Sequence, residues 1–265
     1  MNRRHFAAAL IALAIASPLR SAEMPEVVEY GHLRGRFVYD GEPPLPKPFI
    51  DKGLLVGHSE NLLVNPTTLG IANLGVWLEP RRGEPLPPIH PSYGMHAAKP
   101  DGPRTKKLAI AGSRFEPHIV LLRTDEVLVI TNTDKVPGNA KFEMINNPSL
   151  NPLLPPAAEK REAFVKPERI PTHISSAIHP WMRANILVKD HPYFAVTDSD
   201  GNFEIRNLPA GEREFRCWHE VAGYITAVKR EDVPQKWMAG RVKLTIPADD
   251  TLDLGEIEVS PTLFR

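Results

Sequence analysis

Proline is the residue type that most constrains how this chain can fold. The 265-residue sequence contains 28 prolines spread along its length, and each one removes a backbone donor and disrupts a helix interior. Between them, short runs of alternating or β-branched residues recur, bounded by turn signals such as Asp-Gly and Asn-Pro. The pattern predicts an all-β protein made of short strands. The length allows two domains, each with a core of its own.

The first 22 residues have the features of an export signal. Arg3 and Arg4 precede an apolar run, residues 6–16, that is too short to span a bilayer comfortably, and small residues follow as far as Ala22. We expect cleavage after Ala22 or Ala16, with an uncleaved anchor as the alternative. The start Arg3-Arg4-His5-Phe6 partly matches the twin-arginine export pattern. The mature protein is therefore expected to be periplasmic or secreted, with no transmembrane segment after the signal.

Charge and cysteine content exclude several classes of function. Lys plus Arg and Asp plus Glu each number 32, and no basic stripe is present, so a nucleic-acid partner is not expected. The single cysteine, Cys217, cannot form an internal disulfide, and its apolar surroundings in sequence predict a buried structural thiol. The chain has no Gly-x-Ser-x-Gly, no His-Glu-x-x-His and no phosphate-binding loop. We therefore expect a protein that is not an enzyme.

After the signal, the sequence divides into three blocks: 23–100, 101–190 and 191–265. In the first block, 32–39 and 75–79 are predicted strands and 80–106 is a predicted loop. Predicted strands of the second block are 108–110, 118–122, 126–131, 162–166, 173–178 and 184–188. Those of the third block are 193–197, 202–206, 212–218, 241–246 and 255–259. Regular short strands separated by turn signals are typical of β-sandwiches.

The third block carries two motifs, residues 197–203 (TDSDGNF) and 208–211 (LPAG). On these it resembles the carboxypeptidase regulatory-like domain, a transthyretin-like β-sandwich, and is similar to the small sandwich domain of rhamnogalacturonan lyases. The opening motif of such a domain is missing from this block, but residues 35–43 near the N-terminus supply it. We therefore predict a split sandwich, with first strands from residues 31–80, last strands from 193–259, and the middle block inserted between them.

The middle block has its own set of motifs. They are Phe115-Glu-Pro-His118, Val129-Ile-Thr-Asn-Thr-Asp134, Ile178-His-Pro-Trp-Met182, Asp190-His-Pro-Tyr-Phe194 and Trp218-His-Glu220. On these, residues 100–240 resemble secreted bacterial proteins labelled methylamine-utilisation-like, which contain a cupredoxin-like domain. The resemblance implies a cupredoxin-like β-sandwich.

The same resemblance implies a copper-binding loop that has lost ligands. A blue-copper site requires two imidazoles, one thiolate and a weak axial ligand. His179 matches the second histidine and Met182 the axial methionine, whereas Gly138 stands at the first histidine position and Ser176 at the cysteine position. Because glycine offers no ligand and serine is a poor one, an intact type 1 site is not expected. The candidate metal ligands are His179, Met182 and His118, where His118 or His173 would complete a weaker, non-blue site.

Other histidines have structural interpretations. His118 follows a proline at a predicted strand start and is expected to cap that strand or bind a backbone carbonyl. His219 and Glu220 are neighbours at a strand end, so they are expected to face different directions and to serve a surface or interface role. His191 precedes a proline at the predicted domain crossing, where it would clamp the junction.

Three functions remain open on the sequence. The first is an exported non-enzymatic module, without a cofactor, that binds an extracytoplasmic protein or a carbohydrate. The second is a periplasmic copper-binding electron-transfer protein, and the third an accessory carbohydrate-binding protein in polysaccharide breakdown. If the residue matching is right, Ser176→Cys combined with Gly138→His should create a coloured copper site.

Overall fold

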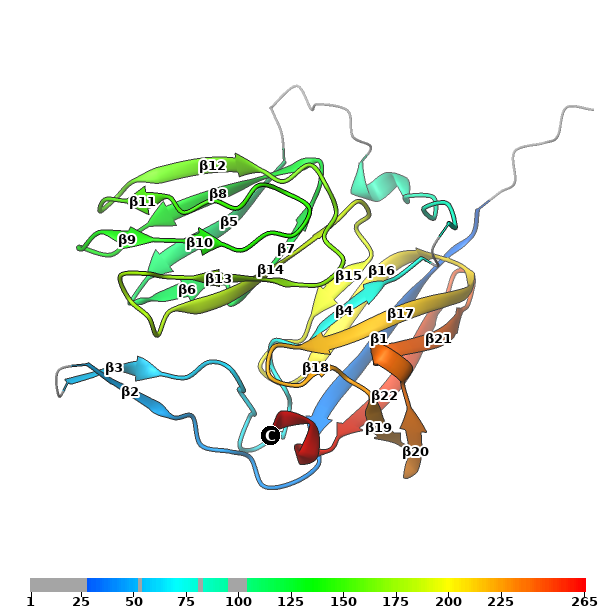
Figure 1. Cartoon of the computed structure of the whole chain (residues 1–265). Helices are drawn as coiled ribbons and strands as arrows, with labels where there is room; N and C mark the ends of the chain where they lie inside the picture. The colour runs from blue at the N-terminus through cyan, green and yellow to red at the C-terminus, as the bar shows by residue number, and fades with distance from the viewer. Residues whose placement is uncertain (1–27, 52–53, 81–82, 95–103) are drawn as a thin grey trace, which may run out of the picture.

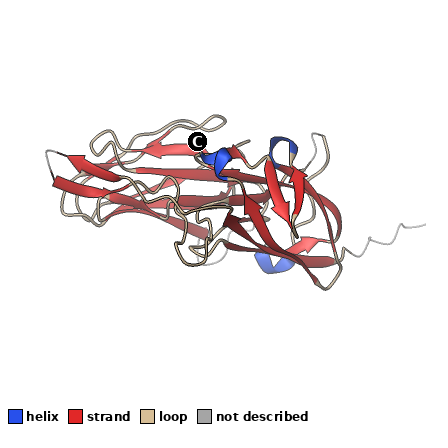
Figure 2. Cartoon of the chain, turned by 90° about the horizontal axis from the view of Figure 1, so that it is seen from below, coloured by secondary structure: helices blue, strands red, loops and turns tan. Residues whose placement is uncertain are grey.

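The computed structural model describes residues 28–51, 54–80, 83–94 and 104–265, so the predicted signal at 1–22 lies outside the described residues. Within the described ranges the chain consists of strands and three short 3-10 turns, and the all-β prediction is confirmed (Figure 2). The strands form two β-sandwiches, each with its own buried apolar core (Figure 1). Among the described residues, no helix has the length and apolar character needed to cross a membrane.

The first sandwich, called here the terminal sandwich, takes strands from both ends of the chain. One sheet has the order β16 (Asn202–Pro209), β1 (Tyr30–Tyr39), β22 (Thr251–Val259), β19 (Ala227–Arg230) and β20 (Val233–Lys236). The other has the order β15 (Phe194–Val196), β4 (Gly75–Leu78), β17 (Gly211–His219) and β18 (Gly223–Tyr224), with β21 (Arg241–Ile246) also paired to β17.

Strand β1 joins the two ends of the chain. It pairs antiparallel with β16 and parallel with β22, so that Arg36 lies opposite both Asn202 and Glu256. The alternating sequence of β1 directs Leu33 and Phe37 into the core, as expected for a strand with one buried face. Segments before and after the middle block thus share one sheet. The predicted domain boundaries themselves stay a prediction.

The second sandwich, the middle sandwich, is built from one continuous stretch of chain. One sheet has the order β12 (Glu159–Ala163), β8 (Glu126–Asn132), β5 (Arg104–Ala111) and β6 (Arg114–Glu116). The other has the order β10 (Lys141–Phe142), β13 (Thr172–Ser175), β14 (Arg183–Lys189) and β7 (Ile119–Arg123). Two short strands, β9 (Gly138–Asn139) and β11 (Leu153–Leu154), pair with each other at one end.

The two sandwiches pack against each other through a buried apolar junction. Trp77 of β4 and Trp218 of β17 contact Ile119 of β7 and Leu187 of β14. Alternate residues of β14 face the middle core and the junction, so the strand is buried on both faces, and its sequence is correspondingly apolar. The contact between the sandwiches is therefore part of the hydrophobic core of the molecule.

Several elements differ from those predicted. A hairpin of β2 (Pro48–Asp51) and β3 (Leu54–His58) extends from the terminal sandwich beneath the middle sandwich, in a stretch with no predicted strand (Figure 1). Strands β19 and β20 were also not predicted. The predicted loop 80–106 contains a 3-10 turn, η1 (Pro91–Tyr93), and ends early because β5 begins at Arg104. The other 3-10 turns are η2 (Met238–Gly240) and η3 (Pro261–Phe264).

Candidate functional site

His118 lies where three parts of the chain meet. It follows β6 in the middle sandwich, while Glu60 follows β3 and Glu220 follows β17. The Nε2 atom of His118 is hydrogen-bonded to the Glu220 carboxylate, and its Nδ1 lies 3.8 Å from Oε2 of Glu60. The His118 and Glu220 side chains are only 7% and 8% exposed, so both charges are largely removed from water. We call these three residues the His118 cluster.

The charges of the His118 cluster determine its protonation. Burial alone would lower the pKa of His118, but the hydrogen bond to Glu220 and the charges of Glu220 and Glu60 outweigh it and raise this pKa to about 9. The His118 ring in turn holds the pKa of Glu60 below its usual value. At neutral pH the residue is therefore an imidazolium between two carboxylates. Both ring nitrogens then carry protons, and an imidazolium has no lone pair to offer a metal.

This geometry corrects the strand-capping interpretation of His118, because its ring contacts carboxylates and not a backbone carbonyl. His219 and Glu220 do face different partners, as expected of neighbours at a strand end. The His219 ring packs edge-on against Phe264 with 5.1 Å between centroids, and Glu220 also lies 3.4 Å from Nδ2 of Asn185 on β14. Glu220 thus ties the end of β17 to the middle sandwich.

A second group of charged residues lies at the other end of the apolar junction between the sandwiches. The Nζ atom of Lys189 lies 3.2 Å from Oε2 of Glu79 and 5.2 Å from the ring centroid of Trp77. Trp77 donates its Nε1 hydrogen to the same carboxylate at 2.7 Å. Burial lowers the pKa of Lys189, although Glu79 opposes that shift. The apolar junction therefore lies between two buried ionic groups. Together, these contacts fix how one sandwich packs against the other.

The loop that resembles a copper-binding loop is held by protein hydrogen bonds. Oδ1 of Asn139 accepts from the Ser176 hydroxyl at 2.8 Å and from the backbone amides of Ala177 and Ile178 at 3.0 and 3.2 Å. The Ser176 hydroxyl oxygen accepts from the amide of His179 at 3.0 Å. Asn139 and Ser176 thus give the loop a defined shape through contacts within the protein.

The residues at this loop do not fit a type 1 copper centre. A Cβ atom on Gly138 would lie 2.9 Å from Cδ1 of Ile110, so a side chain at position 138 requires the Ile110 side chain to shift. Met182 is 2% exposed and packs in the middle core. Nδ1 of His179 is buried without a hydrogen-bond partner, which leaves one imidazole nitrogen and one thioether as free donors. This set lacks the thiolate and the second imidazole that the centre requires.

Across the described part of the chain, no group of three or more His, Cys, Asp or Glu side chains is placed to hold a metal ion. Cys217, as predicted, is buried in the core of the terminal sandwich, and burial raises the pKa of its thiol. His173, the other residue considered for a rescued site, lies on β13 and is exposed. The structure thus gives His118 other partners, and within the described residues no metal-binding group of three such side chains forms at the loop.

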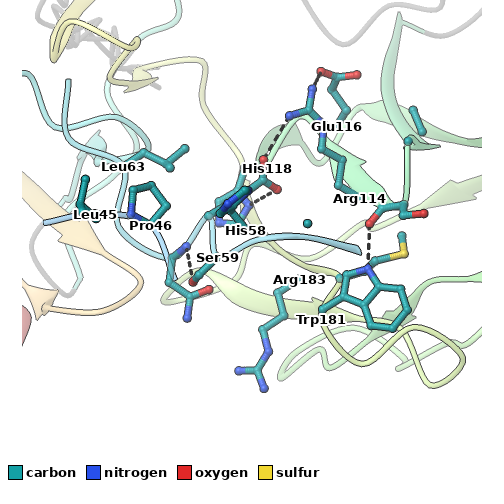
Figure 3. A pocket seen from close by; sticks show the side chains of 17 residues that line it. Leu45, Pro46, His58, Ser59, Leu63, Arg114, Glu116, His118, Trp181 and Arg183 are labelled. Atoms are coloured by element: carbon teal, nitrogen blue, oxygen red, sulfur yellow. Dashed lines mark hydrogen bonds and ion pairs between the residues drawn. The ribbon is translucent and has the colours of Figure 1, made fainter. Parts of the chain in front are cut away.

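A groove of about 990 Å³ opens beside the His118 cluster (Figure 3). One wall comes from residues that flank the β2–β3 hairpin, and the other from the ends of β5, β6 and β14. Arg114, Glu116 and His118 line it together with Trp181, whose Nε1 donates to the backbone oxygen of Ser113 at 3.1 Å. A second hollow of about 620 Å³ adjoins it, because Asn61 and Arg183 line both.

Comparisons with known proteins reach only part of this chain. No protein-family model and no curated protein matches it. Among solved structures, an amicyanin M98A mutant with Cu(I) is 16% identical, and the match covers 32% of this chain and 81% of that chain with a TM-score of 0.29. A Cu-containing nitrite reductase from Thermus scotoductus SA-01 is 20% identical over 38% of this chain and 27% of that chain, with a TM-score of 0.31.

A purple cupredoxin from Nitrosopumilus maritimus is 18% identical over 31% of this chain and 97% of that chain, with a TM-score of 0.27. These structures are cupredoxins, and each covers about a third of the present chain. At such identities and TM-scores the likeness carries nothing about ligands. The transthyretin-like and methylamine-utilisation resemblances stay predictions.

The sequence pointed to the loop at 176–182 but missed the residues around the groove. Glu60 lies in a stretch without strand periodicity, and its contact with His118 depends on the hairpin segment crossing to the other sandwich. Arg114 and Arg183 were not singled out, and Glu116 appeared only within the motif 115–118. One usable signal was the spacing between Arg114 and Glu116, which places both on one side of an extended strand.

Proposed function

We propose that this protein is an exported, non-enzymatic binding module built on a cupredoxin-like sandwich that lacks an intact type 1 copper site. The observation that carries the proposal is the groove whose two walls come from different parts of the chain and are joined by the His118 cluster. A groove with fixed walls loses little conformational entropy when a ligand binds. The signal pattern at residues 1–22 supports export.

The chemistry of the groove favours a carbohydrate over a protein partner. Trp181 offers a half-buried indole ring on the wall, while Ser59, Asn61, Arg114 and Glu116 supply hydroxyl, amide, guanidinium and carboxylate groups beside it (Figure 3). An aromatic ring packs on the apolar face of a sugar, and mixed donors and acceptors match its hydroxyls. Protein interfaces are instead centred on a desolvated apolar patch.

Trp181→Ala is expected to weaken binding of an oligosaccharide about tenfold, because the ring that contacts the sugar is removed. Trp181→Phe is the matched control, since it keeps an aromatic ring but loses the hydrogen bond to Ser113, and it should retain most of the affinity. Binding is measured by calorimetry after a glycan array has identified the oligosaccharides retained. If the unmodified mature chain retains no glycan on the array, the proposal is wrong.

The second candidate function, copper-dependent electron transfer, is favoured by one observation, the unpartnered Nδ1 of His179. The structure changes the test proposed from the sequence. Ser176→Cys with Gly138→His should remain colourless as long as Ile110 keeps its position, because the new side chain contacts Ile110 at its Cβ atom. Adding Ile110→Ala should give an intense visible charge-transfer band with copper(II).

Ile110→Ala alone is the control for the copper experiment, and it should bind no copper tightly. A coloured double variant would show that Ile110 moves aside freely. A coloured, unsubstituted protein would overturn the assignment of a degenerate site and favour the electron-transfer function.

A further inference from the structure

Resting on the proposed function, we infer that the groove selects an anionic oligosaccharide and that Arg183 is the residue that recognises its acidic group. The first step is the charge balance of the groove. Arg114 lies 3.3 Å from Glu60 and 2.9 Å from Glu116, and His118 is held by Glu60 and Glu220. These cations are therefore already neutralised by carboxylates of the protein.

Arg183 is different. Its side chain is exposed, and its guanidinium has no hydrogen bond or ion pair within the described residues. Two carboxylates border the adjoining hollow, but Glu143 is bound by Lys141 at 2.6 Å and Glu220 by His118. The Arg183 guanidinium is thus left without a direct carboxylate partner among the described residues.

The position of Arg183 suits ligand recognition. It begins β14, where its backbone pairs with Ser175 of β13, so its Cα is fixed by the sheet. Figure 3 shows its side chain extended at the edge of the groove, close to Trp181 and directed away from Arg114 and Glu116. Because Arg183 lines both hollows, a ligand that occupies the two together must pass it.

Chemistry then defines the ligand class. A guanidinium presents paired N–H donors that match a carboxylate or sulfate in bidentate fashion. Trp181 beside it offers a face for a sugar ring. Two adjoining hollows of about 990 and 620 Å³ have room for several sugar units. The ligand is therefore an oligosaccharide that carries carboxylate or sulfate groups.

The test compares three hexasaccharides with the mature chain by calorimetry: a galacturonate hexamer, a sulfated galactose hexamer and a neutral glucose hexamer. We expect one anionic hexamer to bind about tenfold more tightly than the neutral one. Comparing the galacturonate hexamer with the sulfated galactose hexamer shows whether the site prefers a carboxylate or a sulfate. Arg183→Gln should remove that preference and bring the affinity for the anionic hexamer down to that for the neutral one. Added sodium chloride should weaken only the anionic binding.

Arg34→Gln is the matched control, because Arg34 is also exposed but lies on β1 in the terminal sandwich. It should leave all three affinities unchanged. Equal binding of neutral and anionic hexamers, or an anionic preference that survives Arg183→Gln, overturns the inference while the proposed function stands. If none of the three hexamers binds and the glycan array is also empty, the proposed function fails and the inference fails with it.

Discussion

His118→Leu is expected to lower the free energy of unfolding by about 3–5 kcal/mol, because it removes one partner of a buried ionic group and leaves Glu220 uncompensated. Without the imidazolium, Glu220 loses its cation, whereas Glu60 keeps Arg114 at 3.3 Å. Glu220 is only 8% exposed and cannot recover its hydration without moving. The end of β17 and the hairpin segment should then separate from the middle sandwich.

Urea denaturation followed by tryptophan fluorescence and by circular dichroism measures this loss. The matched control is Arg34→Leu, which breaks the exposed ion pair to Asp253 at 2.8 Å and should cost less than about 1 kcal/mol. A second variant, Glu220→Gln, keeps the side-chain shape and should also lower the free energy of unfolding. Equal losses for His118→Leu and Arg34→Leu would mean that the His118 cluster does not join the sandwiches.

Acidification below pH 6.5 should destabilise the protein steeply through two other histidines. Burial, reinforced by the charge of Lys189 for His191 and of His118 for His219, lowers the pKa of both to about 3. Unfolded, each imidazole binds a proton near pH 6.5, whereas folded it remains neutral. The unfolded state therefore binds more protons between pH 6.5 and 3, and stability falls as pH falls. Each imidazole contributes a slope of about 1.4 kcal/mol per pH unit.

His118 gives the opposite slope on the alkaline side. Its pKa is about 9 in the folded protein, so its contribution is complete below pH 6.5 and is lost as pH rises through 9. The urea concentration at the midpoint of unfolding, measured from pH 4.5 to 10, should thus fall toward low pH on an acid limb and toward high pH on an alkaline limb. His118→Leu should abolish the alkaline limb, while His191→Gln and His219→Gln should each flatten the acid limb. Stability that stays constant between pH 6.5 and 4.5 would contradict the burial of these two imidazoles.

Much of the fold could be predicted from the sequence, because strand periodicity is a local property. The alternation in β1, β16 and β22 and the apolar run of β14 each identify a strand from fewer than a dozen residues. The β2–β3 hairpin could not be predicted from the sequence, because proline, charged and apolar residues are mixed in it without a period of two. What specifies that hairpin is its place between the two sandwiches, a tertiary property.

The sequence indicated candidate residues where a family resemblance applied and missed those where distant segments meet. The resemblance to a copper-binding loop indicated Ser176, His179 and Met182. The obstruction by Ile110 was invisible, because that side chain comes from another strand. The contact between His118 and Glu220 joins residues 102 apart in the sequence, and neither residue is unusual on its own.

The pairing of β1 with β22 also constrains the order in which the chain can fold. Arg36 binds Glu256, which is 220 positions away in the sequence, and β1 has β22 on one side and β16 on the other. Contacts between residues so far apart in the sequence form late in folding, because a long loop must close before any of them can form. The middle sandwich uses only nearby segments and can collapse while the C-terminal strands are still being synthesised. Strand β1 can therefore pair with β16 only after the middle sandwich has been synthesised, and its sheet is completed only when β22 follows.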